Sequence, residues 1–283
     1  MWFKNLRIFR LGPQFEVSAQ ALAEMLAKHQ FAPGGSQEPL SLGWVPPREG
    51  GELVHEVNGQ YLICLRVEKK LLPSAVVNQA AREKAREIEE QIIIDLMPRS
   101  HAVQRDTMVW IDTQNHWFVI DAAAVAKSDE VLGLFAKSVE PFPVQPLYTE
   151  WSPAGAMTAW LVDDDAPANF TIDQDAELRS TGDSGAAVRY VQQSADIDEV
   201  RKHVEAGKQC TRLAMTWADR ISFVLTDALD VKRVAPLDIL TEKPDQGMAN
   251  DNDIFDADMT LMTAELAKMI SDLVEVLGGE RRD

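Results

Sequence analysis

The stretch Val200–Leu225, with the sequence VRKHVEAGKQCTRLAMTWADRISFVL, predicts a helix, a glycine stop and two strands joined by a tight turn. Val200, His203 and Val204 are spaced by three and four residues, so they share one face of a helix. Gly207 follows where the end of a helix favours a residue that is free to adopt positive φ. A period of two then begins, which indicates a β-strand.

This alternation predicts that Lys208 and Arg212 lie on one face of the strand, roughly 13 Å apart at about 3.3 Å per residue. The same face would carry Cys210, Ala214 and Thr216, and the opposite face would carry Gln209, Thr211, Leu213, Met215 and Trp217. A short turn then leads into Ile221–Leu225, and Val231–Val234 would add a third strand. Two cations on one sheet face could hold a phosphate backbone; the alternative is an ordinary solvated face.

Length and composition indicate a globular protein without a membrane span. The chain has 283 residues, of which 46% are hydrophobic and 26% charged, enough for one large domain or two small ones. No apolar run approaches the roughly 20 residues of a membrane helix, and the N-terminus lacks the apolar core of a signal peptide. We therefore expect a cytoplasmic protein.

Two cysteines form neither a disulfide framework nor a zinc site, so no cofactor is expected.

The net charge of −17 is unevenly distributed along the chain. Residues 161–183 carry a net charge of −6 and residues 242–283 a net charge of −7. The remainder is nearly balanced, so a local basic surface is compatible with an acidic chain.

The order of the expected elements favours the α+β class, with mixed antiparallel sheets and flanking helices. Residues 1–72 and 106–165 are expected to form a central body, and residues 73–105 a projecting helical arm. Residues 166–283 are expected to form a C-terminal body that ends in a long helix from about Asp256 to Leu277.

The sequence contains no recognisable catalytic constellation, which favours a binding protein over an enzyme. Consecutive carboxylates at Asp163, Asp164 and Asp165 suggest a metal-dependent hydrolase as one alternative, although such a run on a loop is more often a solvated acidic turn and the spacing of an EF-hand is absent. A second alternative is an acidic interaction protein, or a DNA mimic, that binds a basic partner through residues 163–183 and the C-terminal acids.

Short motifs along nearly the whole chain resemble those of the RdgC family, the bacterial recombination-associated and nucleoid-associated proteins. They are Trp2–Leu6, Arg10–Leu11, Gly35–Gln37, Gly43–Pro47, Leu72–Ser74, Val76–Asn78, Glu83–Lys84, Pro98–Arg99, Pro143–Val144, Pro146–Leu147, Asp175–Leu178, Glu205–Lys208, Thr211, Leu213–Ala214, Trp217, Phe223, Phe255–Asp258, Leu261–Met262 and Leu277–Gly279.

The resemblance implies a non-catalytic protein that binds double-stranded DNA with little sequence preference. It implies a homodimer closed into a ring whose hole encircles the duplex, a nucleoid association in the cytoplasm, and a role in restraining the strand-exchange recombinase. A ring would let acids face outward while bases line the hole, and such binding should weaken steeply with salt.

Ten basic residues are the candidate phosphate contacts, chosen by charge and segment rather than matched to known family sites. They are Lys69, Lys70, Arg82, Lys84, Arg86, Arg99, Arg105, Lys202, Lys208 and Arg212. Two departures from the family pattern accompany them. The segment after Lys84 lacks about twenty residues of the family's helical region, and Gln192–Gln193 lacks a preceding lysine pair.

Overall fold

The computed structural model describes residues 1–71, 98, 101–182, 185–193, 196–241 and 250–281. Within them the chain forms six helices and twelve strands, and every pairing between these strands is antiparallel, which confirms the α+β class. The strands are β1 (Asn5–Leu11), β2 (Leu40–Val45), β3 (His55–Val57), β4 (Gln60–Leu71), β5 (His101–Asp112), β6 (Trp117–Ile120), β7 (Val144–Pro146), β8 (Phe170–Ser180), β9 (Ala187–Tyr190), β10 (Lys208–Trp217), β11 (Ile221–Thr226) and β12 (Val231–Pro236). The helices are α1 (Ala19–Ala27), α4 (Val125–Ser138), α5 (Pro153–Asp163), α6 (Ile197–Glu205), α7 (Asp238–Thr241) and α8 (Asp251–Val276).

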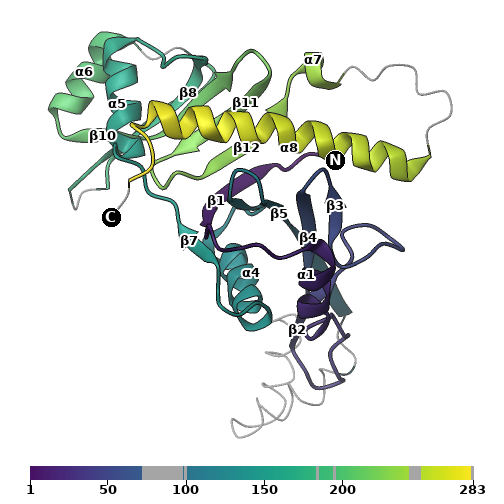
Figure 1. Cartoon of the computed structure of the whole chain (residues 1–283). Coiled ribbons are helices and arrows are strands. Elements are labelled where there is room, and N and C mark those ends of the chain that lie inside the picture. Colours follow the sequence, from purple (N-terminus) through teal and green to yellow (C-terminus); the bar gives the residue numbers. More distant parts are fainter. Residues whose placement is uncertain (72–97, 99–100, 183–184, 194–195, 242–249, 282–283) are drawn as a thin grey trace, which may run out of the picture.

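Strand β1 joins the two halves of the sheet, whose order is β2-β4-β5-β6-β1-β12-β11-β10-β8-β9. Asn5 and Leu6 pair with β12, whereas Arg7 to Arg10 pair with β6. The predicted hairpin of β10 and β11 is confirmed, and β12 adds the expected third strand. The first and last thirds of the chain therefore share one sheet (Figure 1).

Helix α8 lies across one face of this sheet (Figure 1). The Asn250 side chain caps its first turn by accepting a hydrogen bond from the Asp253 N–H. The methionines and leucines of α8 are buried, apart from the partly buried Leu261, and belong to one core with residues of the sheet such as Leu6 and Trp110. No helix in the described part of the chain is long and apolar enough to cross a membrane.

The two halves of the sheet differ in how they are covered. Helices α1 and α4 form a second core with β1, β4, β5 and β6, centred on Leu22, Phe118 and Phe135. In the other half, α5 and α8 cover one face of β8, β10 and β11. The opposite face of that half carries charged side chains instead of a third layer.

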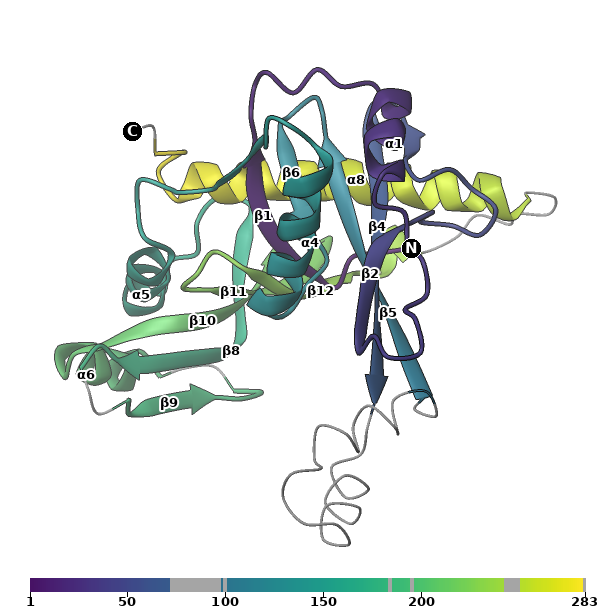
Figure 2. The ribbon, with the colours of Figure 1, turned by 90° about the horizontal axis from the view of Figure 1, so that it is seen from below.

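Strands β4 and β5 form a long ribbon, paired from Gln60 with Asp112 to Leu71 with His101, and its end projects from the body (Figure 2). The expected helical arm is therefore wrong for residues 101–105, which belong to β5. The backbone is extended there because these residues pair with β4. The Arg66–Asp106 ion pair, at 2.6 Å, joins the two strands at the next residue of β5. The helix expected after Pro73 lies outside the described residues.

Candidate nucleic-acid interface

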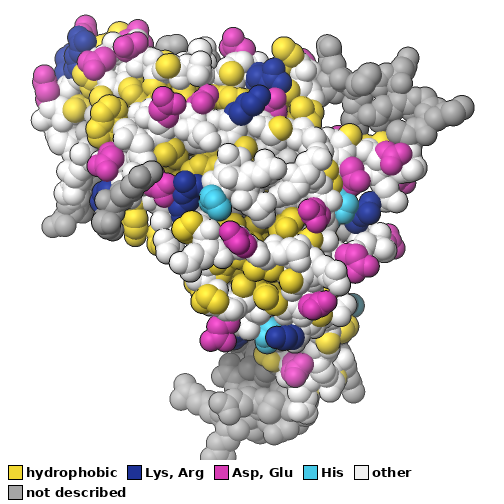
Figure 3. All heavy atoms as spheres, in the orientation of Figure 1, with side chains coloured by type: hydrophobic (Ala, Val, Ile, Leu, Met, Phe, Trp, Pro, Cys, Tyr) yellow, Lys and Arg dark blue, Asp and Glu magenta, His cyan; other side chains and the backbone are white. Residues whose placement is uncertain are grey.

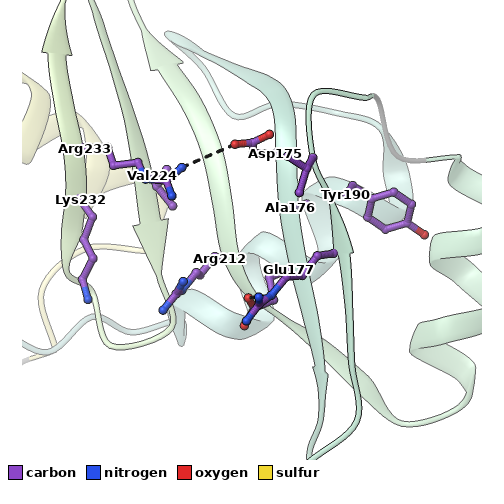
Figure 4. A pocket seen from close by; sticks show the side chains of 10 residues that line it. Asp175, Ala176, Glu177, Tyr190, Arg212, Val224, Lys232 and Arg233 are labelled. Carbon is purple, nitrogen blue, oxygen red and sulfur yellow. Dashed lines mark hydrogen bonds and ion pairs between the residues drawn. The ribbon is translucent and has the colours of Figure 1, made fainter.

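The uncovered face of strands β8 to β12 contains a cavity of about 270 Å³. Its charged lining consists of four cations and two acids: Arg189, Arg212, Lys232, Arg233, Asp175 and Glu177 (Figure 4). We call these six residues the cationic cavity. A local excess of positive charge in a chain of net charge −17 makes this face suited to an anion.

A β-bulge in β10 decides which side chains reach the cavity. Cys210 pairs with Leu178 and Arg212 pairs with Glu177, so Thr211 is an extra residue on the β10 side. Cys210 consequently faces α5, where its N–H donates to the Thr158 hydroxyl at 2.9 Å, while Arg212 points to the uncovered face.

The bulge overturns the expectation that Lys208 and Arg212 share a face. Lys208 lies before the bulge, on the α5 and α6 side, with its Nζ 3.4 Å from His203 Nδ1. An uninterrupted period of two was assumed for β10, and one bulged residue shifts the phase of everything after it. Cys210 therefore shares the buried face of Leu213, Met215 and Trp217.

Three cations of the cavity have weak or no acid partners. Arg212 is exposed and has no ion pair among the described residues. Lys232 Nζ lies 3.9 Å from Asp230, and an Arg233 nitrogen lies 3.7 Å from Asp175. At these distances both pairs are long, so the cations remain available to another anion.

Glu177 organises the other side of the cavity. Its two carboxylate oxygens accept hydrogen bonds from Arg179 Nε at 2.5 Å and from Arg189 Nε at 2.6 Å. Burial works to raise the pKa of Glu177, but the hydrogen bonds and charges of the two arginines prevail, so its pKa is lowered. The carboxylate is therefore ionised at neutral pH.

A second cationic groove lies between the β4–β5 ribbon and α4, with a volume of about 420 Å³. Lys69, Arg105 and Lys127 line it with one acid, Glu130. Lys70 points to the other side of the ribbon, because neighbouring residues of a strand alternate, and its Nζ donates to the Gly35 carbonyl. Two of the ten predicted contacts thus meet in one groove.

One further predicted contact lies in the described part of the chain, and four do not. Lys202 is exposed on α6, and Arg82, Lys84, Arg86 and Arg99 lie outside the described residues. The sequence patterns did not indicate four other basic residues of this face: Arg179, Arg189, Lys232 and Arg233. The signal for Lys232 and Arg233 was their place in the expected third strand, but only the strand order shows that they are near Arg212.

The face crossed by α8 has a different character. Over the described residues of that face, Asp and Glu side chains are scattered among apolar and uncharged ones, and Lys and Arg appear singly or in small groups (Figure 3). Acidic side chains are thus exposed on the face that α8 crosses.

The carboxylates and thiols singled out by the sequence form neither a metal-ligand cluster nor a reactive thiol in the described part of the chain. Asp163 ends α5 and Asp164 is its cap, and no three His, Cys, Asp or Glu side chains lie close enough there to hold a metal ion. Burial raises the pKa of both Cys64 and Cys210 to about 12, so neither thiol is a nucleophile at neutral pH.

The fold and this site define an α+β protein with an uncovered, cation-lined sheet face. The chain belongs to the RdgC family: the model of that family, described as "Putative exonuclease, RdgC", matches residues 1–280. This confirms the resemblance found in the sequence motifs.

Three similar proteins that this chain matches over nearly their whole length share one name. The protein "Recombination-associated protein RdgC" of Bordetella parapertussis is 56% identical over 298 residues, covering 100% of both chains. Proteins of that name from Janthinobacterium sp. (52% identical, 99% of both chains) and Burkholderia cenocepacia (50% identical, 100% of this chain and 97% of the relative) are also similar. The Bordetella alignment is longer than this chain of 283 residues, so that relative contains residues with no counterpart in this chain.

Proposed function

We propose that this chain binds double-stranded DNA without sequence preference, as a homodimer that closes into a ring around the duplex. The observation that carries the proposal is the cationic cavity on the uncovered face of β8 to β12. Arginine suits this role because its planar fork matches a phosphate and stays charged at every physiological pH.

The absence of sequence preference follows from the kind of contact. Lys and Arg that bind phosphate oxygens fix a protein on a duplex but do not read base edges. The cavity presents its cations from neighbouring strands of a sheet, which suits the backbone of any sequence. The groove of Lys69, Arg105 and Lys127 would extend this contact along the ribbon.

The homodimer is proposed from the family resemblance. One uncovered face can contact a duplex from one side only, whereas a second copy related by a two-fold axis would present an equivalent face from the other side. In such a ring the scattered acids of the α8 face would point outward. The relatives' name associates them with recombination. From the family resemblance we propose that this chain regulates the strand-exchange recombinase in the cytoplasmic nucleoid.

The test is binding of unrelated duplex sequences, linear and closed circular, as a function of salt, with the mass of the protein measured in parallel. We expect similar affinities for all sequences, a linear fall of log affinity with log salt, and longer retention on circles. A strong sequence preference would contradict the proposal, as would the absence of binding at low salt; the latter would favour an acidic protein that binds a basic partner.

The family description raises a second candidate, an exonuclease. Incubation of end-labelled duplex with the protein and Mg²⁺ or Mn²⁺ distinguishes the two functions. We expect DNA of unchanged length. Shortening that is lost in a variant of the Asp163–Asp165 carboxylates would establish nuclease activity and revive the metal-dependent alternative.

A further inference from the structure

Glu177 is far more buried than Asp175, the other acid of the cationic cavity. It is 5% exposed, whereas the side chains of Arg179 and Arg189 that it holds are 47% and 61% exposed. Each carboxylate oxygen takes the Nε of one arginine. One edge of each guanidinium is therefore fixed, and its outer nitrogens remain at the surface.

We infer that Glu177 is a positioning residue for DNA binding, which holds Arg179 and Arg189 in the orientation that a phosphate group contacts. The inference rests on the proposed function. A long arginine side chain loses much rotamer freedom when it binds, and a buried carboxylate that restrains it in the free protein reduces that loss on association.

The neighbouring strands place a third arginine beside this pair. Arg212 is the cross-strand partner of Glu177 on β10, and Arg189 is its partner on β9. Arg212 has no ion pair in the described part of the chain, so its positive charge is not neutralised by a direct acidic partner there. The group as a whole is three guanidinium ions around one buried acid, and its net charge is positive.

Neutralising Glu177 should change DNA affinity in the direction opposite to the one expected from charge repulsion alone. An acid that does nothing but repel phosphates should, when neutralised, tighten DNA binding by about twofold. If Glu177 positions two arginines, the Glu177→Gln variant should instead bind about threefold to tenfold more weakly. Asp175→Asn is the matched control, because Asp175 lines the same cavity but pairs with Arg233, at 3.7 Å, and accepts a hydrogen bond from the Gln192 N–H, at 2.9 Å, instead of binding Arg179 or Arg189.

The experiment measures duplex affinity by fluorescence anisotropy between about 50 and 200 mM salt. We expect weaker binding for Glu177→Gln, partial recovery for Glu177→Asp, and equal or tighter binding for Asp175→Asn. The double variant Arg179→Lys/Arg189→Lys keeps both charges but loses the Nε hydrogen bonds, so it should reproduce the loss even if Glu177→Gln does not fold.

The outcomes separate the inference from the proposed function. If the wild type does not bind DNA, both fail. If the wild type binds and Glu177→Gln, with an unchanged circular dichroism spectrum, binds as tightly or more tightly, the inference alone is overturned. The same holds if the double lysine variant binds like the wild type.

Discussion

Arg220 and Glu265 form a two-pronged ion pair in which Nε and Nη2 of the arginine each lie 2.8 Å from a carboxylate oxygen. Arg220 stands at the turn between β10 and β11, and Glu265 lies on α8, where it is 7% exposed. The pair therefore ties the hairpin that carries Arg212 to the helix that covers the other face of the sheet.

Replacing Arg220 by Ala should lower the free energy of unfolding by about 2 to 3 kcal/mol, because it leaves a nearly buried carboxylate without its partner. Urea unfolding followed by circular dichroism measures the change. Arg201→Ala is the control, since its pair with Asp198 is exposed and 3.9 Å long, and it should cost less than about 0.5 kcal/mol. Equal effects of the two substitutions would show that the Arg220 pair contributes no special stability.

Arg212 and Lys208 should differ in their contribution to DNA binding, because the bulge at Thr211 places them on opposite faces of β10. Arg212→Glu should weaken binding about tenfold near 0.1 M salt and reduce the salt slope by about one. Lys208→Glu should change affinity less than about twofold. Anisotropy titrations at several salt concentrations test both. The reverse order of effects would mean that the duplex lies on the α6 side.

Lys69 and Lys70 are adjacent in sequence but face opposite sides of the ribbon, which makes them a matched pair. Lys69→Glu combined with Arg105→Glu should reduce the salt slope by about two if the groove contacts phosphates. Lys70→Glu should leave the slope nearly unchanged. If Lys70→Glu alone lowers the slope, the duplex follows the other side of the ribbon.

The lowered pKa of Glu177 predicts a specific dependence of stability on pH. A carboxyl whose pKa is lower in the folded than in the unfolded protein stabilises the fold above its unfolded pKa, and this contribution is lost as the pH falls through the folded value. The difference in unfolding free energy between wild type and Glu177→Gln should therefore be largest at neutral pH and shrink below pH 4.5, the ordinary value for Glu. Urea unfolding at a series of pH values measures it, and a difference that grows on acidification would contradict the assignment.

The sequence was sufficient for elements whose signals are local. The hairpin of β10 and β11 follows from alternation and a short turn, and the end of α6 follows from Gly207, whose φ is +80°. Helix α8 was expected from its apolar stripe, although it begins near Asp251, because Asn250 provides an earlier cap than the pattern indicated. The family resemblance likewise required only the order of short motifs.

The composition of the cationic cavity was decided by tertiary structure. Arg189, Arg212 and Lys232 come from three separate strands, and the strand order and register that bring them together depend on contacts between distant segments. The bulge at Thr211 moved Lys208 away from Arg212, a shift of phase that alternation alone does not reveal. The sequence by itself therefore determined the local elements, the family and the uneven charge. Long-range pairing determined which charges share a face, because a strand specifies the alternation of its side chains but not the neighbours it will meet.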